Sequence, residues 1–244
     1  MEENSKFEFI RINSDNKQLD LLSDFHQNIC KSSFNEHELE SFDIWKYELE
    51  NDFMTFFILV LFDNKVVGGL AYEVYTNSAC IMITYVAIDK NFRGTGLSKI
   101  LINEAIKDIN ALNISIILIE VIIPEDQNGI NRQKIWTKLN FTPTDIVYTH
   151  PAYLKWKPYQ IAVYNPNQIE NLTIDLKTIE LFLIEYFNHI IKNNIDNNND
   201  DDKSEINSVI LILHKIINDV IIANNSKWKD SVTKLPRIAS LTLE

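Results

Sequence analysis

The sequence predicts a mixed α/β protein whose sheet is antiparallel in its first half. Three strand-length apolar runs follow one another with only short polar turns between them, as in an antiparallel meander. An amphipathic helix then separates the third run from a fourth, nearly continuous β-branched run, which favours a right-handed parallel crossover. The expected order of elements is βαα-βββ-α-β-α-ββ.

One strand and two helices are expected before the meander. Residues 7–12 alternate as in a strand, and apolar residues recur at helical spacing over 19–29. A second helix is expected over residues 36–50. His26 and His37 lie in or beside these helices, and we interpret both as surface or partly packed side chains. No carboxylate–histidine spacing supports a metal site.

The meander is expected over residues 56–62, 65–75 and 79–89. Gly68 and Gly69, inside the second strand, indicate a bulge or a close approach of two backbones. The third strand runs directly into a turn that contains two further glycines.

The remaining elements of this region alternate between helix and strand. They are expected as a helix over 97–110, a buried strand over 114–123, a helix over 130–139 and closing strands over 145–150 and 160–164. The buried strand is expected to run parallel to the strand before the glycine turn, because a helix connects the two.

The turn between this strand and helix carries the strongest functional signal. Arg93-Gly94-Thr95-Gly96 precedes a helix that begins at Leu97. The first amides of a helix have no internal partners, and glycine lets the backbone approach a bulky anion. The turn is therefore suited to phosphate, although an ordinary helix entry is the alternative. It is neither a Walker loop nor a dinucleotide fingerprint, because the lysine and the third glycine are missing.

Read as Arg-x-x-Gly-x-Ser, with Arg93, Gly96 and Ser98, the turn resembles the Arg/Gln-x-x-Gly-x-Gly/Ala loop of the GNAT superfamily. These proteins are N-acyltransferases that use acyl-CoA. Serine at the last position is a departure from the family pattern. The resemblance covers roughly residues 7–164.

Two further segments follow in the order that this family shows. Glu120-Val121, near the end of the buried strand, looks like the second conserved strand of the family. Residues 136–141 are similar to its Tyr-x-Lys-x-Gly-Phe helix end, with Asn140 in place of the glycine. Asparagine is the next best residue for a left-handed helix cap, so this replacement is physically cheap.

The resemblance implies acetyl-CoA as the co-substrate and no metal. In this family the pantetheine arm pairs with the strand before the loop, and the loop amides hold the diphosphate. Asn128 or Asn131 would reach the arm from its other side. Carried over, the strand and loop residues are Val86, Ala87, Ile88, Arg93, Gly94, Thr95, Gly96, Leu97 and Ser98.

Acyl transfer to an amine also needs a base and a donor for the oxyanion. Glu73 and Glu120 are the candidate bases, because each is a carboxylate inside an apolar strand. Glu73 pointing to solvent is the alternative for that residue. Tyr85 is a third candidate, although a buried structural tyrosine is more frequent. A backbone N–H near Ile88 would serve the oxyanion.

Trp136 stands where many members of the family have a tyrosine that protonates the leaving thiolate. An indole N–H donates hydrogen bonds but is no acid at neutral pH. Tyr148 or His150 would substitute, or the thiolate would leave unprotonated, given a free-thiol pKa near ~8.5. The alternative functions are an acyl-CoA-binding regulatory module with weak turnover and a plain interaction protein.

Two regions are expected: an acetyltransferase domain over residues 1–168 and a helical appendage over 169–244. Apolar stripes over 174–191 and 206–221 predict a helical hairpin, and the Asn/Asp-rich run 192–203 is interpreted as a flexible linker. Each stripe must be buried against the first domain, a partner or a second copy, which would give a homodimer.

Composition limits the partners. The chain has 23 basic and 34 acidic residues, a net charge of −11, so a general basic field for nucleic acid is absent. Acidity weakly favours cationic acceptors, and the expected acceptor is a primary amine of a small molecule or protein. Two cysteines give no disulfide framework, and the apolar runs are too short for a membrane span. Because the first residues are acidic and polar, we expect no signal peptide there. A cytoplasmic protein is expected.

Overall fold

A computed structural model describes residues 7–36, 38–51, 53–112, 114, 116–124, 127–148, 159–167, 169, 173–197, 233–234 and 239–240. The chain forms two compact units. The first unit comprises residues 1–74 and 81–115, and the second comprises 75–80 and 116–244. No helix in the described ranges is long and apolar enough to cross a membrane.

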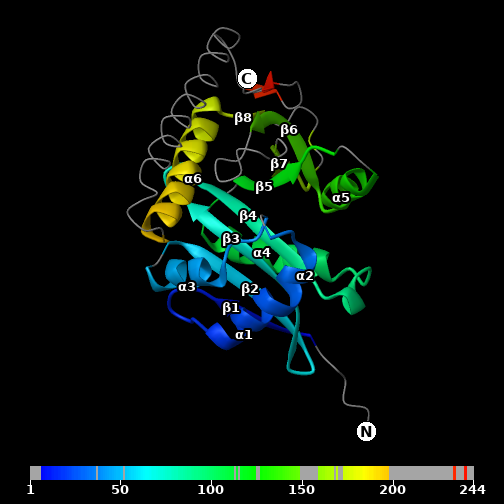
Figure 1. Ribbon diagram of the computed structural model, residues 1–244. Coiled ribbons are helices and arrows are strands. Elements are labelled where there is room, and N and C mark those ends of the chain that lie inside the picture. Colours follow the sequence, from blue (N-terminus) through cyan, green and yellow to red (C-terminus); the bar gives the residue numbers. More distant parts are fainter. Residues whose placement is uncertain are drawn as a thin grey trace. The chain divides into compact units, whose positions relative to one another are not determined.

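The first unit contains the expected meander (Figure 1). Its strands are β1 (Glu8–Ile12), β2 (Thr55–Phe62), β3 (Lys65–Tyr75) and β4 (Cys80–Ile88), in the spatial order β1-β2-β3-β4. Both β1 and β3 pair antiparallel with β2. The sequence placed all four strands within one residue of their observed bounds, because alternation and short polar turns are strong local signals.

A β-bulge lies beside the two glycines of β3, as predicted. Val60 pairs with Gly68, whereas Leu61 pairs with Val66, so Val67 is the extra residue. A Cβ on Gly68 would lie 2.7 Å from the Ile88 side chain and 3.0 Å from the Ala87 carbonyl oxygen. The missing side chain therefore lets β3 lie directly against the end of β4.

The first helical segment runs from residue 19 to residue 33 without a break. It consists of α1 (Leu19–Asp24), the π-helical η1 (Phe25–Cys30) and α2 (Lys31–Ser33). Phe25 and Trp45 stack with ring centroids 6.1 Å apart, and Trp45 packs on Phe57 of β2 and Tyr85 of β4. This aromatic group forms the centre of the first unit's core.

The second helix begins later than predicted. It is α3 (Phe42–Glu50), whereas the sequence indicated a start at residue 36. The Ser41 hydroxyl accepts a hydrogen bond from the Ile44 amide and caps the helix. Immediately before it, the Glu40 amide donates to the Tyr85 hydroxyl (3.1 Å) and the Glu40 carbonyl oxygen lies 2.8 Å from Nε2 of His26. These long-range bonds hold Glu40 outside the helix.

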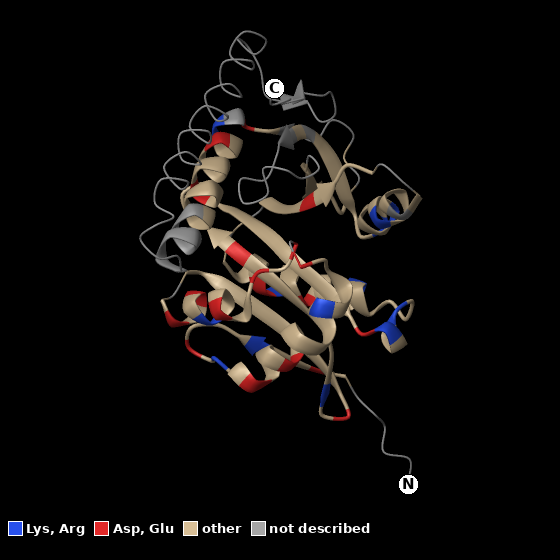
Figure 2. Ribbon diagram, viewed as in Figure 1, with Lys and Arg blue, Asp and Glu red and all other residues tan. Residues whose placement is uncertain are grey.

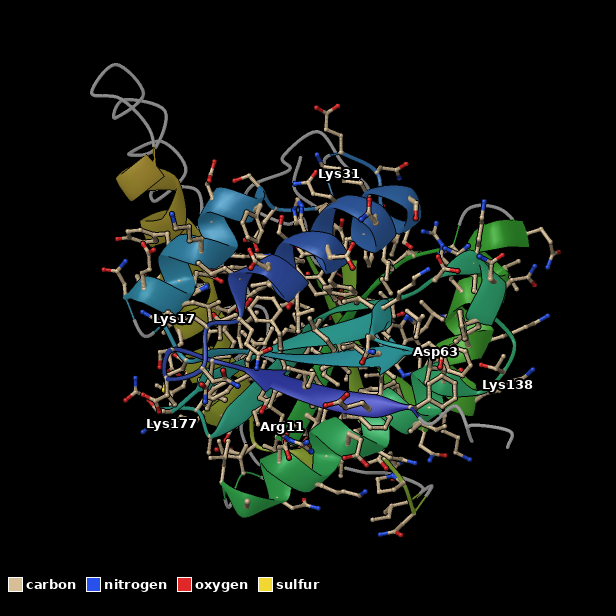
Figure 3. All side chains as sticks on the ribbon, turned by 90° about the horizontal axis from the view of Figure 1, so that it is seen from below. Arg11, Lys17, Lys31, Asp63, Lys138 and Lys177 are labelled. Atoms are coloured by element: carbon tan, nitrogen blue, oxygen red, sulfur yellow. The ribbon has the colours of Figure 1, made fainter. Side chains whose placement is uncertain are left out.

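Helix α4 (Leu97–Ala111) follows the glycine turn, and one arginine joins it to the sheet. Arg11 of β1, labelled in Figure 3, donates from Nε to both Asp108 oxygens (2.8 and 3.0 Å) and from Nη2 to Glu104 (3.1 Å). Glu104 also pairs with Lys107, and both neighbours lower the pKa of its carboxyl group. Because these ion pairs are partly exposed, they contribute little to the free energy of unfolding.

The second unit has β5 (Ile116–Ile122), β7 (Tyr159–Tyr164) and β6 (Phe141–Tyr148) in that spatial order, with β7 antiparallel to both neighbours. Its first helix is α5 (Gln127–Lys138). Short strands add to this unit: β10 (Ala239–Ser240) pairs parallel with β6, and β8 (Thr173–Ile174) pairs with β9 (Thr233–Lys234).

Strand β6 begins at Phe141, four residues earlier than the sequence indicated. Asn140 has a left-handed φ of 67°, as the cap interpretation predicted, and ends the helical segment directly before the strand. Pro143 lies at a shift in the β6–β7 pairing, where no ladder amide is required. The buried Thr144 hydroxyl donates to the Ile161 carbonyl oxygen (2.8 Å) at this shift.

Helix α6 (Leu176–Asn197) confirms the first apolar stripe of the tail. Its buried members are Ile179, Phe182, Leu183, Tyr186, Phe187 and Ile190. The helix continues to residue 197, so the interpretation of 192–203 as a linker is wrong for residues 192–197. The second expected helix, 206–221, lies outside the described residues, as does the hairpin that it would form.

Helix α6 binds the turn between β3 and β4. Oε1 of Glu185 accepts from the main-chain amide (2.9 Å) and side chain (2.8 Å) of Asn77, and Oε2 accepts from the Ser78 amide (2.8 Å). The Tyr75 ring packs edge-on against Phe182 and Tyr186, with centroids 5.3 and 5.9 Å apart. One carboxylate and one aromatic ring therefore fix this turn to the helix.

Candidate functional site

The polypeptide leaves β4 through a compact turn. The Asp89 carboxylate accepts from the Asn91 amide (2.8 Å), and the Asp89 carbonyl oxygen accepts from the Phe92 amide (2.9 Å). These bonds form the short 3-10 helix η2 (Lys90–Phe92). The Thr95 hydroxyl then donates to the Phe92 carbonyl oxygen (2.7 Å). Local side chains thus determine the shape of the turn.

Both glycines of the turn are required by its backbone. Gly94 has φ of 80° and Gly96 has φ of 86°, in the left-handed region that glycine adopts without strain. Nothing lies within 4 Å of a Cβ built on either residue, so the requirement comes from the backbone and not from crowding. Gly96 is also the N-cap of α4 and has no capping side chain.

The turn leaves a row of main-chain donors available. Within the described part of the chain, no acceptor is found for the amides of Gly94, Thr95, Gly96, Leu97 and Ser98. Residues 93–96 are exposed, whereas Leu97 is buried and fixes the start of the helix. Unpaired amides at the positive end of a fifteen-residue helix make an anion-binding site.

Positive side chains gather at this turn in an otherwise acidic chain. Lys90, Arg93 and Lys99 flank the glycines and outnumber the one carboxylate of this segment, Asp89, whereas the charged residues of α1 and α3 are mainly acidic (Figure 2). The local charge therefore has the sign that a diphosphate needs, although the net charge of the chain does not.

The Arg93 guanidinium is hydrogen-bonded within the protein. Its Nε donates to the Ile88 carbonyl oxygen (3.0 Å) and its Nη2 donates to the Ser33 hydroxyl (3.1 Å). Ser33 lies at the end of α2, sixty residues earlier in the chain. This contact could not be predicted from the sequence, because Ser33 belongs to no recognised motif.

The end of β4 precedes the turn and is supported from β3. Ala87 is buried, and Val86 and Ile88 are half-buried. The Asp89 amide donates to the Val67 carbonyl oxygen (2.9 Å), which belongs to the bulge residue of β3. The bulge and Gly68 together set where β4 ends and the turn begins.

Glu73 is buried on β3, 6% exposed, so the alternative that it points to solvent is wrong. It pairs across the ladder with Thr55, and both lie on the sheet face that carries Phe57 and Ala71 of the core cluster. Thr55 Oγ1 is a buried side-chain oxygen with no hydrogen-bond partner among the described residues. Polar groups are thus enclosed at this end of β2 and β3.

Tyr85 and His26 have structural partners. The Tyr85 hydroxyl accepts from the Glu40 amide, and its ring packs edge-on against Phe34 at 5.4 Å. His26 is buried more completely than the surface or partly packed position expected from the sequence, and burial lowers the pKa of its imidazole. His37 lies outside the described residues. In the described ranges no three His, Cys, Asp or Glu side chains are placed to hold a metal ion.

The remaining candidates belong to the second unit. Glu120 is half-buried in β5 and pairs with Ile161. Trp136 is half-buried in α5, and its ring meets Phe141 edge-on at 5.5 Å. Tyr148 pairs with Tyr159 across β6 and β7, and its side chain lies outside the described residues, as does all of His150.

The asparagines expected near the pantetheine arm lie on α5. Asn131 is exposed and accepts a hydrogen bond from Gln127 (3.2 Å), whereas the Asn128 side chain is outside the described residues. Neither observation tests their assignment to the arm.

Comparison with known proteins supports this interpretation of the turn. Residues 19–131 match the model of the acetyltransferase (GNAT) family. The comparison with curated proteins finds no match.

Solved structures share the fold at low identity. A protein assigned to the GNAT family from Bacteroides thetaiotaomicron is 14% identical, with a TM-score of 0.52 over 65% of this chain and 86% of that chain. A second, from Desulfovibrio desulfuricans, is 13% identical, with a TM-score of 0.51 over 65% and 98%. Escherichia coli ElaA is 14% identical, with a TM-score of 0.50 over 66% and 100%. The segment that the acetyltransferase (GNAT) family model matches includes the whole glycine turn.

Proposed function

We propose that the protein transfers an acyl group, most simply acetyl, from acyl-CoA to a primary amine by direct attack in a ternary complex. The family implies acyl-CoA as the co-substrate. The observation that carries the proposal is the row of unpartnered amides at residues 94–98, opened by two left-handed glycines. Several unpartnered amides in succession at a helix N-terminus suit the oxygens of a diphosphate.

The strand before the turn supplies the next part of the proposed site. The backbone of Val86, Ala87 and Ile88 would pair with the amide groups of the pantetheine arm, as an added strand does. A main-chain N–H near Ile88 would donate to the oxyanion of the tetrahedral intermediate. The close support of Ile88 by Gly68 favours a fixed donor, which is the property that oxyanion stabilisation requires.

Proton transfer completes the chemistry. The neutral amine attacks the thioester carbon, a C–N bond forms, and the C–S bond then breaks. Glu73 or Glu120 takes the proton that the amine loses. Glu73 is buried on β3, which is a position shielded from bulk water. The acidity of the chain favours cationic amines as acceptors through encounter rate.

The leaving thiolate needs a proton or a stabilising donor. Trp136 supplies only a hydrogen bond, and Tyr148 is the residue that we assign to proton donation. Asn128 and Asn131 remain the residues proposed to contact the arm.

Calorimetry and a thiol assay test this function. Purified protein should bind CoA and acetyl-CoA with saturation, and should release free thiol from acetyl-CoA when a suitable amine is present. Absence of saturable heat with either ligand would refute the proposal. A panel of polyamines, aminoglycoside-like amines and lysine peptides then identifies the acceptor class.

The second candidate is an acyl-CoA-binding module with weak turnover, and Trp136 favours it. Trp136→Tyr should raise thiol release about tenfold or more if the indole limits an otherwise competent site. Trp136→Phe is the matched control, because it keeps a ring against Phe141 without a hydroxyl. Binding of acetyl-CoA without thiol release in all three proteins would favour the module.

The domain boundary near residue 168 and dimerisation through the tail stay proposals. The stripe of α6 is already buried within one chain, so a homodimer would need another surface of residues 169–244. Light scattering of the full chain tests this, and a monomer at all concentrations would contradict it.

A further inference from the structure

The Arg93 side chain joins three separate segments of the first unit. It starts in the glycine turn, its Nε bonds the last carbonyl of β4 at Ile88 (3.0 Å), and its Nη2 bonds Ser33 at the end of α2 (3.1 Å). One guanidinium therefore connects the strand end, the turn and the first helical segment.

The hydrogen bonds at Ser33 are chemically specific. The Ser33 hydroxyl donates its one proton to the Ile29 carbonyl oxygen (2.8 Å), so it meets Arg93 as an acceptor. Guanidinium donates and never accepts, and its fork presents Nε and Nη2 along the same edge. Lysine cannot reproduce both bonds, because its ammonium is a single point of charge.

We propose that Arg93 is a positioning residue, with Ser33 as its partner, and that this contact holds the amides of residues 94–98 in their anion-binding arrangement. The inference rests on the proposed function, since it concerns the same CoA site. It differs from a direct role of Arg93, in which the guanidinium would pair with the diphosphate. The Nε–Nη2 edge, one of the two edges through which a guanidinium forms bidentate pairs, is already occupied by Ile88 and Ser33.

The Ser33 variant separates the two roles. Ser33→Ala leaves every positive charge of the turn in place and removes only the acceptor of Nη2. Positioning predicts that CoA binds about threefold to fivefold more weakly. A direct role predicts no change. Ser32→Ala is the matched control, because Ser32 lies next along the helix and bonds Ile29 (2.9 Å) without a contact to Arg93.

Arg93 variants measure the energetic coupling between Arg93 and Ser33. Arg93→Ala should weaken CoA binding further, and the double variant Arg93→Ala/Ser33→Ala should equal Arg93→Ala alone, because the second change removes a contact already lost. Ser33→Thr should restore binding, since threonine keeps an oxygen that bonds the preceding turn. Lys90→Ala removes one charge of the turn and should lower the salt dependence of binding, whereas Ser33→Ala should leave it unchanged.

Amide hydrogen exchange on the ligand-free protein provides a measurement independent of CoA. Exchange of the hydrogen-bonded amides on either side of the turn, those of Asp89, Asn91, Phe92 and Lys99, should be faster in Ser33→Ala than in Ser32→Ala. If wild-type protein binds no CoA, the proposed function fails and exchange alone decides whether the Arg93–Ser33 contact fixes the turn. If Ser33→Ala matches Ser32→Ala in both exchange and CoA affinity, the positioning role is overturned.

Discussion

Strand β4 lies between two groups of main-chain amides that the protein treats differently. Before the strand, the amides of Asn77 and Ser78 donate to the carboxylate of Glu185. After the strand, the amides of residues 94–98 have no acceptor in the described part of the chain. The first group has an internal anion, whereas the second is available for an external one.

The difference shows how a structural site and a binding site arise from the same donors. Converging amides attract an anion wherever they occur. A carboxylate on α6 satisfies the turn at residues 76–79 and makes it part of the fold. At the glycine turn the nearby carboxylate, Asp89, bonds the Asn91 amide instead, so the amides of residues 94–98 stay available to a ligand. Because these amides are exposed, water can hydrogen-bond to them until a ligand binds, and leaving them without a protein acceptor costs little free energy.

Replacing the internal anion should give the largest effect. Glu185→Gln substitutes a donor for one of the two accepting oxygens, and should lower the free energy of unfolding by about 2 kcal/mol. Urea denaturation measures this. Affinity for CoA should stay unchanged, since the variant leaves the glycine turn intact. Glu180→Gln, on the same helix, is the control and should be close to neutral. A loss of CoA affinity in Glu185→Gln would contradict the view that the turn bound by Glu185 and the glycine turn have separate roles.

Closing the open amides is the second test. Gly96→Val forces a β-branched residue to φ near 86° and should weaken CoA binding about tenfold, with no steric clash involved. Gly96→Asn should retain most of the affinity, because asparagine tolerates left-handed conformations. Equal affinities of the valine variant and the wild type, by calorimetry, would show that the backbone of the turn is not what binds CoA.

Thr55 tests an unpaired group in the interior. Its buried hydroxyl has no partner among the described residues, so Thr55→Val should raise the free energy of unfolding by about 1 kcal/mol. Urea denaturation and the thiol assay are measured together. If the hydroxyl has no catalytic part, turnover stays at the wild-type level. A less stable variant would mean that the oxygen does have a partner in solution.

A pH series on His26 should give the smallest effect. Burial lowers the pKa of the imidazole below its ordinary 6.5, so the folded protein binds fewer protons than the unfolded chain in this range. Stability should be full above about pH 6.5 and fall as the pH drops towards the folded pKa. His26→Gln should flatten this decline in urea denaturation over about pH 5 to 8. An unchanged slope would assign the decline to other groups.

The sequence predicted the fold well where local patterns decide it. Alternation placed β1–β4, and helical spacing placed α4 and α6. It failed where distant residues decide. The start of α3 depends on His26 and Tyr85 holding Glu40, and neither contact is visible in the spacing of residues 36–41. The start of β6 depends on a shifted pairing that accommodates Pro143.

The candidate site divides in the same way. The glycine turn was predictable, because its requirements are local: two positive φ angles and a helix start. Its supports were not, because Ser33 and Val67 reach it only through the tertiary fold. Asn140 could be interpreted from the sequence alone. It replaces the glycine of the family pattern, and its left-handed φ is one that asparagine tolerates.

Glu185 lies 108 residues after Asn77, whereas Arg93 lies only 60 residues after Ser33. A ribosome therefore releases everything that shapes the glycine turn long before it has made α6. The nascent chain can assemble its glycine turn early, but the opposite end of β4 must wait for the tail to be synthesised. We expect the last folding event of this enzyme to take place far from its co-substrate.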